Sequence, residues 1–381
     1  MGFRPGLKGS LEQILEVGKN QLHHQPPVNK PDAPVQFCKH KPSLIFDGTV
    51  STFCLEVSLP LGITILTSQF ETDDEKIDPE IMVRVYTPKE KPIGPLPLGV
   101  FGHGGGFCGG DLNSDDKTAR YMAENVPCIV VSIDYRLGPK FKFPTMLNDF
   151  ETGFNWVSVI NKVPIHNRTV IADKNMLIQA YDNAEKLGGD QSRVFAWGCS
   201  AGGTLSCGLA KRLAEKGQNT KLIGIMNLAG GTMHPDNVPD HLRDHYKSVE
   251  ENGVGVPIID RHVMDIFNGS LHPDSIFKWS RRIAKSEACV GAINANPHDT
   301  DYAPALSKNL KDFPKTYSVA CGLDPLRDDA IIMDSELKKA GVTTKIDIYP
   351  GLPHIFWVFD GLPSTKVFYE NILEGAKFIL S

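Results

Sequence analysis

A serine at position 200 lies between two glycines in the stretch "FAWGCSAGG". An apolar run suited to a buried strand precedes it and a helical pattern follows, which is the order strand, G-x-S-x-G, helix. A serine on a sharp strand-to-helix turn needs neighbours without side chains, and Gly198 and Gly202 meet that need. The chemistry would be nucleophilic attack by Ser200. The motif alone also fits a turn of small residues that packs a helix onto a strand.

A second glycine-rich stretch, "FGHGGGFCGG", follows another apolar run. Loops of this type stabilise the oxyanion in lipases and esterases, together with the N–H of the residue after the nucleophile. The predicted donors are Gly105, Gly106 and Ala201. A phosphate-binding loop is the alternative, but no G-K-S/T follows and no G-x-G-x-x-G has the right spacing. We expect His103 to anchor the loop rather than to act as a base.

An acid and a base should follow the serine in that chain order. Asp324 follows the apolar run "YSVACGL", and His354 lies in the Gly/Pro loop "PGLPHIFW" after the next such run. Asp328 competes with Asp324, but Asp328 and Asp329 suit the first turn of a helix, where carboxylates are favoured. The prediction is a triad in which Asp324 orients His354, and His354 removes the proton of Ser200.

These residues must be positioned by a regular scaffold. Short apolar runs predict strands over 81–88, 96–106, 127–137, 193–200, 221–231, 315–324 and 344–351. Helical patterns alternate with them over 114–125, 144–160, 201–217, 328–341 and 364–380. Such alternation predicts an α/β fold with a mostly parallel sheet covered by helices on both faces.

The segment 232–297 interrupts this alternation, because it is polar, histidine-rich and poor in strand signals. We interpret it as an insertion that forms a cap together with an N-terminal arm, residues 1–75. The core then comprises residues 76–231 and 298–381. Four histidines of the insertion either line a pocket or lie on solvated cap surface: His234, His241, His245 and His262.

Composition narrows the class of protein. The 381 residues carry a net charge of −5, from 40 basic and 45 acidic side chains without a basic stripe, which argues against a nucleic-acid partner. No apolar run approaches the ~20 residues that a membrane span needs. The eight cysteines form no C-x-x-C pair and no metal-binding pattern. We expect a reduced, cytoplasmic protein.

The ordered motifs HGGGF, GCSAGG, DPLRD and a late histidine resemble those of the hormone-sensitive-lipase-like group of α/β-hydrolase carboxylesterases. The segments "DYRLGPKFKFPTMLNDF" and "NPHDTDYAPAL" extend the resemblance. It implies an α/β-hydrolase fold with a mainly helical cap, no cofactor, and a small-molecule ester as the partner. A homodimer is left open.

Three positions depart from the family pattern. Cys199 replaces the usual aspartate, so we expect a nearby polar contact to be missing. Ile355 replaces a glycine after the base, and Lys140 replaces a glutamate. Cys199 is also an alternative nucleophile, although on a sharp elbow its side chain should point away from the serine side.

The functional prediction is a serine carboxylesterase that hydrolyses small to medium or aromatic esters. Apolar side chains in the stretch 264–279, "MDIFNGSLHPDSIFKW", suggest an apolar underside of the cap suited to a bulky or aromatic ester. Two alternatives stay open: an acyltransferase with the same triad, and a non-catalytic ligand receptor on a hydrolase fold.

Overall fold

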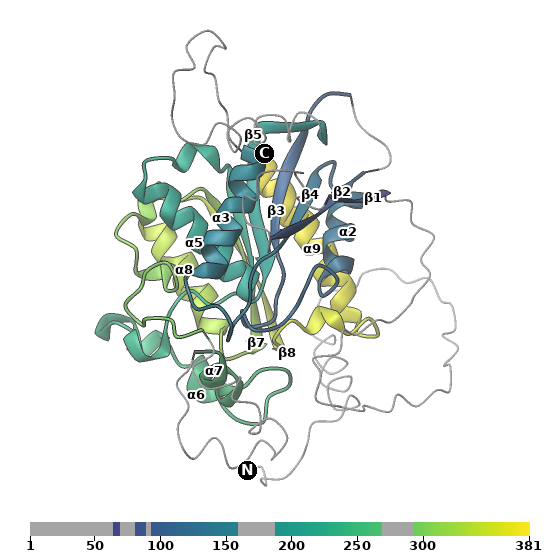
Figure 1. Cartoon of the computed structure of the whole chain (residues 1–381). Helices are drawn as coiled ribbons and strands as arrows, with labels where there is room; N and C mark the ends of the chain where they lie inside the picture. Colours follow the sequence, from purple (N-terminus) through teal and green to yellow (C-terminus); the bar gives the residue numbers. More distant parts are fainter. Residues whose placement is uncertain (1–63, 69–80, 89–92, 159–186, 269–292) are drawn as a thin grey trace, which may run out of the picture.

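The structure, a computed structural model, describes residues 64–68, 81–88, 93–158, 187–268 and 293–381 (Figure 1). Their strands form an eight-stranded sheet in the order β1-β2-β4-β3-β5-β6-β7-β8. β1 is antiparallel to β2 and β2 to β4, whereas every pairing from β4 to β8 is parallel. The predicted α/β class and mostly parallel sheet are confirmed. The strands are β1 (Thr64–Ser68), β2 (Met82–Thr87), β3 (Leu96–Gly102), β4 (Ile129–Asp134), β5 (Gly189–Cys199), β6 (Gly224–Leu228), β7 (Lys315–Leu323) and β8 (Thr344–Pro353).

Each of the seven apolar runs forms a strand, β2 to β8. The sequence missed β1, which lies inside the segment assigned to the N-terminal arm and forms an edge of the sheet. Residues 1–63 of that segment lie outside the described residues.

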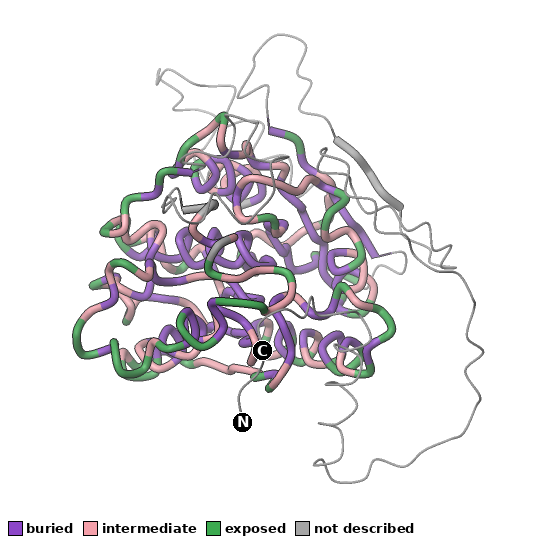
Figure 2. The backbone as a smooth tube through the Cα atoms, turned by 90° about the horizontal axis from the view of Figure 1, so that it is seen from below, coloured by how far each residue is buried: buried purple, intermediate pink, exposed green. Residues whose placement is uncertain are grey.

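Helices cover both faces of the sheet. α3 (Thr145–Ser158), α5 (Ala201–Glu215) and α8 (Arg327–Lys339) lie on one face, and α2 (Asp116–Asn125) and α9 (Pro363–Leu380) on the other (Figure 1). Because both faces are covered, the central strands are buried on both sides, which explains their continuous apolar runs. Figure 2 shows this pattern, with buried residues inside and exposed residues in the peripheral loops.

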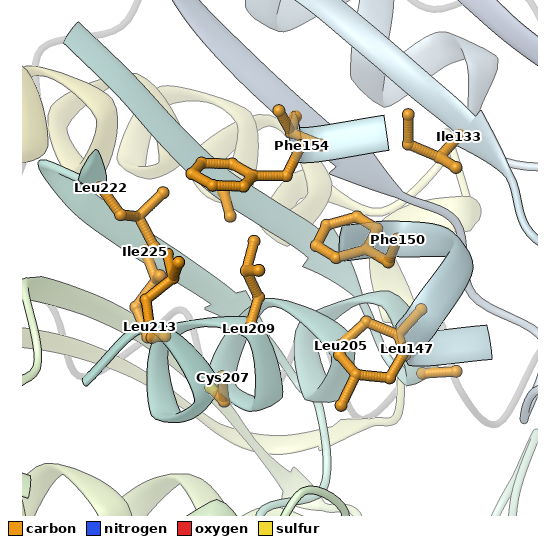
Figure 3. Packing of buried hydrophobic residues seen from close by; sticks show 14 of the residues in the cluster. Ile133, Leu147, Phe150, Phe154, Leu205, Cys207, Leu209, Leu213, Leu222 and Ile225 are labelled. Carbon is orange, nitrogen blue, oxygen red and sulfur yellow. The ribbon is translucent and has the colours of Figure 1, made fainter. Parts of the chain in front are cut away.

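The core between the sheet, α3 and α5 fixes the helix that begins at the serine. Phe150 and Phe154 of α3 lie above Leu205 and Leu209 of α5, and all four are buried (Figure 3). Ile225 of β6 lies against the same helix (Figure 3). Each buried side chain of this size contributes about 1.5–3 kcal/mol. The N-terminus of α5 is therefore held rigidly against the sheet.

The described part of the segment 232–297 forms short helical turns and no strand. The short helices α6 and α7 lie beyond the carboxyl ends of β7 and β8 (Figure 1). Residues 269–292 lie outside the described residues, and they include most of the apolar stretch 264–279. The elements are η4 (Pro235–Asn237), η5 (Asp240–His245), α6 (Ser248–Glu251) and α7 (Arg261–Asn268). The described part of the core also contains the turns η3 (Asn219–Lys221), η8 (Pro304–Leu306), η9 (Leu310–Asp312) and η10 (Phe356–Val358).

Within the described ranges, every helix is too short or too polar to cross a membrane. The five cysteines of these ranges are all reduced: Cys108, Cys128, Cys199, Cys207 and Cys321. Cys38, Cys54 and Cys289 lie outside them.

Candidate active site

Ser200 forms the turn between β5 and α5. Its backbone has φ +52° and ψ −118°, a left-handed conformation that is uncommon for a residue other than glycine. The Ser200 N–H donates to the carbonyl of Leu228 at 2.8 Å, at the end of the neighbouring strand. Strain of this kind costs about 1–3 kcal/mol and persists only where the surrounding structure enforces it. The conformation is that of a nucleophile elbow.

Two glycines bring β3 and α5 into direct backbone contact. A Cβ atom on Gly202 would lie 1.9 Å from the carbonyl oxygen of Gly102, and a Cβ on Gly198 would lie 2.5 Å from the same oxygen. Gly102 is the last residue of β3, and the HGGG loop begins at the next residue. Their contact therefore places that loop beside the serine turn.

The structure brings Ser200, Asp324 and His354 together. The Ser200 Oγ lies 2.8 Å from His354 Nε2, and His354 Nδ1 lies 2.7 Å from Asp324 Oδ2. Asp324 follows β7 and His354 follows β8, so the parallel strands deliver both to the same edge of the sheet. Both side chains are about 1% exposed and Ser200 is 9% exposed. With the carboxylate accepting from Nδ1–H, Nε2 is free to accept the serine proton.

The HGGG loop turns back on itself directly after β3. Gly105 has φ +116°, and its carbonyl accepts the N–H groups of Cys108 at 3.1 Å and Gly109 at 3.0 Å. A Cβ on Gly105 would lie 2.1 Å from the Gly109 oxygen, so no other residue fits there. Within the described residues, the N–H groups of Gly105 and Gly106 donate to no protein acceptor. The first-turn N–H of Ala201 is the third predicted donor.

His103 anchors the loop, as its sequence position predicts. Its ring stacks on Tyr135 with centroids 4.2 Å apart, and its Nδ1 lies 2.7 Å from the carbonyl oxygen of Gly104. The Tyr135 hydroxyl donates to the His103 carbonyl at 2.8 Å. His103 is therefore bound into the scaffold and makes no contact with the serine.

Sequence reasoning missed Asp115, whose carboxylate accepts the Gly104 N–H at 2.7 Å. The same carboxylate lies close to the Cys199 thiol. Burial raises the pKa of the Cys199 thiol well above its usual value, which keeps it protonated and argues against a nucleophilic role. The run "DLNSDD" contains three aspartates, and nothing in it marks which one turns inward.

Asp328 and Asp329 do not replace Asp324 as the acid, because both hold the segment 232–248 against α8. Asp328 Oδ2 accepts the N–H groups of Lys247 and Ser248, at 2.6 and 2.7 Å. The Asp329 carboxylate accepts from Thr232 N–H and Met233 N–H, each at 2.8 Å, and from the Tyr246 hydroxyl at 3.1 Å. Burial raises the pKa of Asp329 to about 7.

An aromatic group begins at Phe107, the residue that follows the glycines of the loop. Tyr302 has its ring centroid 6.1 Å from that of Phe107, 5.5 Å from Phe143 and 5.9 Å from His234. His234 is buried, and burial lowers the pKa of its imidazole. His241 and His245 are exposed, as expected for solvated surface, and the side chain of His262 lies outside the described residues.

Two of the departures from the family pattern have visible consequences. Ile355 has φ +43°, a left-handed conformation that suits glycine and strains a β-branched residue. Lys140 lies with its Nζ 4.6 Å from the ring centroid of Phe141. Neither residue displaces His354 from hydrogen-bond distance of Asp324 and Ser200.

A family model described as the α/β hydrolase fold matches residues 99–358, more than half of the chain. This chain belongs to the α/β-hydrolase fold family. The α/β-hydrolase fold predicted from the motifs is therefore confirmed.

Curated relatives and a solved structure agree with this membership. Versiconal hemiacetal acetate esterase of Dothistroma septosporum is 36% identical over 303 residues, 79% of this chain and 78% of that protein. The protein of the same name from Aspergillus parasiticus is 30% identical over 288 residues, 76% of this chain and 75% of that one. The crystal structure of vibralactone cyclase matches with a TM-score of 0.65 at 26% identity, covering 84% and 80% of the two chains. This α/β hydrolase is an esterase, and its resemblance to hormone-sensitive-lipase-like carboxylesterases is confirmed.

Proposed function

We propose that this α/β hydrolase is a serine carboxylesterase in which Ser200 is the nucleophile, His354 the general base and Asp324 the residue that orients the imidazole. The hydrogen-bonded chain from Ser200 Oγ through His354 to Asp324 carries the proposal, with links of 2.8 and 2.7 Å. His354 accepts the serine proton as Oγ attacks the ester carbonyl and then donates it to the leaving alcohol. Water repeats the two steps and releases the acid.

The proposed oxyanion donors are the N–H groups of Gly105, Gly106 and Ala201. Two observations support them: the tight turn at Gly105, and the backbone contact between Gly102 and Gly202 that sets the loop beside the serine. Backbone donors held in place before the reaction stabilise negative charge that develops on the carbonyl oxygen. Losing one such donor lowers kcat by roughly 10²–10³-fold.

The proposed substrates are small to medium acyl esters, acetates in particular, of a bulky or aromatic alcohol. The aromatic group of Phe107, Phe143, Tyr302 and His234 supports an aromatic partner, because it begins in the oxyanion loop. Two relatives named as acetate esterases support a short acyl group.

We also propose that residues 232–297 form a cap over this site, together with the part of the arm 1–75 that precedes β1, since β1 itself belongs to the sheet. The contacts of Asp328 and Asp329 with the segment 232–248 support it, since α8 begins three residues after Asp324. A cytoplasmic location is part of the proposal and agrees with the reduced cysteines of the described ranges.

The test is hydrolysis of nitrophenyl esters, from acetate to long chains, by the wild-type protein and by Ser200→Ala. Ser206→Ala is the matched control, because Ser206 is a buried serine of the same helix whose hydroxyl binds the Gly202 carbonyl. We expect turnover that favours acetate, is lost in Ser200→Ala and persists in Ser206→Ala. Turnover that survives in Ser200→Ala would refute the assignment.

Two further measurements separate the alternatives. A fluorophosphonate should label the wild-type protein at Ser200, and absence of both labelling and turnover would favour a receptor. Adding an alcohol to the assay distinguishes acyl transfer, since a transferase would form the new ester in preference to the acid.

A further inference from the structure

Asp115 occupies the N-cap position of α2 but does not cap it. Aspartate at this position ordinarily accepts an N–H from the first turn of its own helix, a contact worth about 1 kcal/mol. The Asp115 side chain makes no such bond. Its carboxylate accepts instead from Gly104 N–H at 2.7 Å, so a local stabilising contact is replaced by one to the HGGG loop.

Gly104 lies between Asp115 and the serine turn. A Cβ atom on Gly104 would be 3.5 Å from Asp115 Oδ2, 3.4 Å from the Cys199 carbonyl oxygen and 3.6 Å from Ser200 Cβ. All three are ordinary contact distances for such an atom, so the Gly104 backbone lies next to both the carboxylate and the serine turn. Gly104 also immediately precedes the proposed donor Gly105.

The second contact of Asp115 is with the serine turn itself. The thiol of Cys199 lies close to the carboxylate, and Cys199 is the residue before Ser200. Burial raises the pKa of Asp115, while the Gly104 N–H, His103, Cys199 and His354 oppose that rise. Removing the acceptor would leave the Gly104 N–H without its partner, which makes the contact costly to break.

We propose that Asp115 is a positioning residue: by accepting the Gly104 N–H beside the serine turn, it sets the spacing between the HGGG loop and the Ser200 turn. The inference rests on the proposed function of Ser200. Within the described residues, the hydrogen bonds of His354 and Asp324 do not include Asp115, which acts through Gly104 on the adjacent N–H groups. The physical reason is that oxyanion donors must lie about 2.7–3.1 Å from the oxygen, and a 1 Å error in position costs about 10²-fold in rate.

The test compares Asp115→Ala and Asp115→Asn in the full chain, with nitrophenyl acetate as substrate. Asp115→Ala removes the acceptor, and we expect kcat to fall about 10²-fold with KM changed less than about threefold. Asp115→Asn keeps a side-chain oxygen for Gly104 N–H, and we expect it to recover to within about tenfold of wild type. Affinity for a boronic acid that mimics the tetrahedral state should fall in parallel with kcat/KM, which general destabilisation would not produce.

Asp116→Ala is the matched control. Asp116 is the next residue, and its carboxylate binds Arg84, Tyr86 and Arg120 rather than the loop. We expect this variant to lose stability, measured by thermal unfolding, and to keep kcat within about twofold. A kcat loss of equal size in Asp115→Ala and Asp116→Ala would overturn the proposal.

Cys199 tests the other end of the contact. Cys199→Ser keeps a polar group beside Asp115 and should stay within about threefold of wild type, whereas Cys199→Ala should lose about tenfold in kcat. Cys207→Ala, at another buried cysteine of the α5 region, should be neutral for kcat.

Failure of this inference is distinguishable from failure of the proposed function. Near wild-type kcat in Asp115→Ala, with turnover still abolished by Ser200→Ala, would refute the positioning role alone. Turnover that does not depend on Ser200 would refute both.

Discussion

Replacing Gly202 with alanine is the sharpest test of how the site is assembled. Gly202 is the second residue of α5, where helix propensity alone predicts that alanine stabilises by up to about 1 kcal/mol. The tertiary structure predicts the opposite. The new Cβ would lie 1.9 Å from the Gly102 carbonyl oxygen and 2.3 Å from its carbon, both of them backbone atoms.

The size of the effect follows from that distance. An ordinary Cβ contact begins near 3.4 Å, so α5 and β3 must separate by about 1.5 Å at this point, the difference between 3.4 and 1.9 Å. α5 begins at the serine turn and β3 leads into the HGGG loop, so the separation moves one half of the site against the other. Overpacking costs about 1–3 kcal/mol, and a displacement of 1 Å or more costs at least about 10²-fold in kcat.

The assay is nitrophenyl acetate hydrolysis together with urea unfolding, on Gly202→Ala and two glycine controls. A Cβ on Gly361 meets nothing within 4 Å, so Gly361→Ala should change neither kcat nor stability. Gly217 has φ +63° with open space around it, so Gly217→Ala should lose about 1 kcal/mol of stability at unchanged kcat. If Gly202→Ala unfolds at higher urea and keeps kcat within about threefold, the close-packing argument is refuted.

Three further predictions concern stability. Ile355 has φ +43°, so Ile355→Gly should be more stable than Ile355→Ala by about 1 kcal/mol in urea unfolding. At most positions alanine is the more stable of the two, and that result here would show that the turn is unstrained. The pKa of Asp329 is raised by burial from 3.8 to about 7, so the folded state holds the proton between these values and stability should fall as pH rises from about 4 to 7, by at most about 4 kcal/mol. Asp329→Asn should weaken the dependence of unfolding free energy on pH, measured from pH 5 to 8. An equal pH dependence in the variant and the wild-type protein would contradict the raised pKa of Asp329. The Asp149 carboxylate is about 1% exposed and accepts hydrogen bonds from Arg136 Nε and Nη2 at 2.9 and 2.7 Å. Asp149→Ala should therefore lower the free energy of unfolding by about 3–5 kcal/mol in the same assay. A loss below about 1 kcal/mol would contradict this prediction.

The sequence predicted the scaffold well because hydrophobic periodicity is a local property. All seven apolar runs became strands and all five helical patterns became helices, with ends displaced by a few residues. β1 was not predicted, because its five residues lie in the segment 1–75 that was assigned to the N-terminal arm; they form a strand by pairing with β2. Strand formation at a sheet edge depends on the partner more than on propensity.

The triad residues could be predicted from their order along the chain. Ser200, Asp324 and His354 each follow a parallel strand, and parallel strands present their carboxyl ends at the same edge, so chain order alone implied that the three would meet. Asp115 was not predictable in this way. Its neighbour Asp116 is the same residue type in the same run, and the two differ only in which side of the α2 N-terminus they face.

Local chemistry therefore determined which residues are able to react, and the tertiary structure decided which groups hold them at working distance. The contacts that set those distances join residues far apart in sequence: Gly102 with Gly202, Asp115 with Cys199, and Asp329 with Thr232. Each depends on the packing of whole elements, α5 on β3, the α2 N-terminus on the β5–α5 turn, and α8 on the segment 232–248. No local pattern encodes that packing, because the direction of one side chain follows from where the other elements lie.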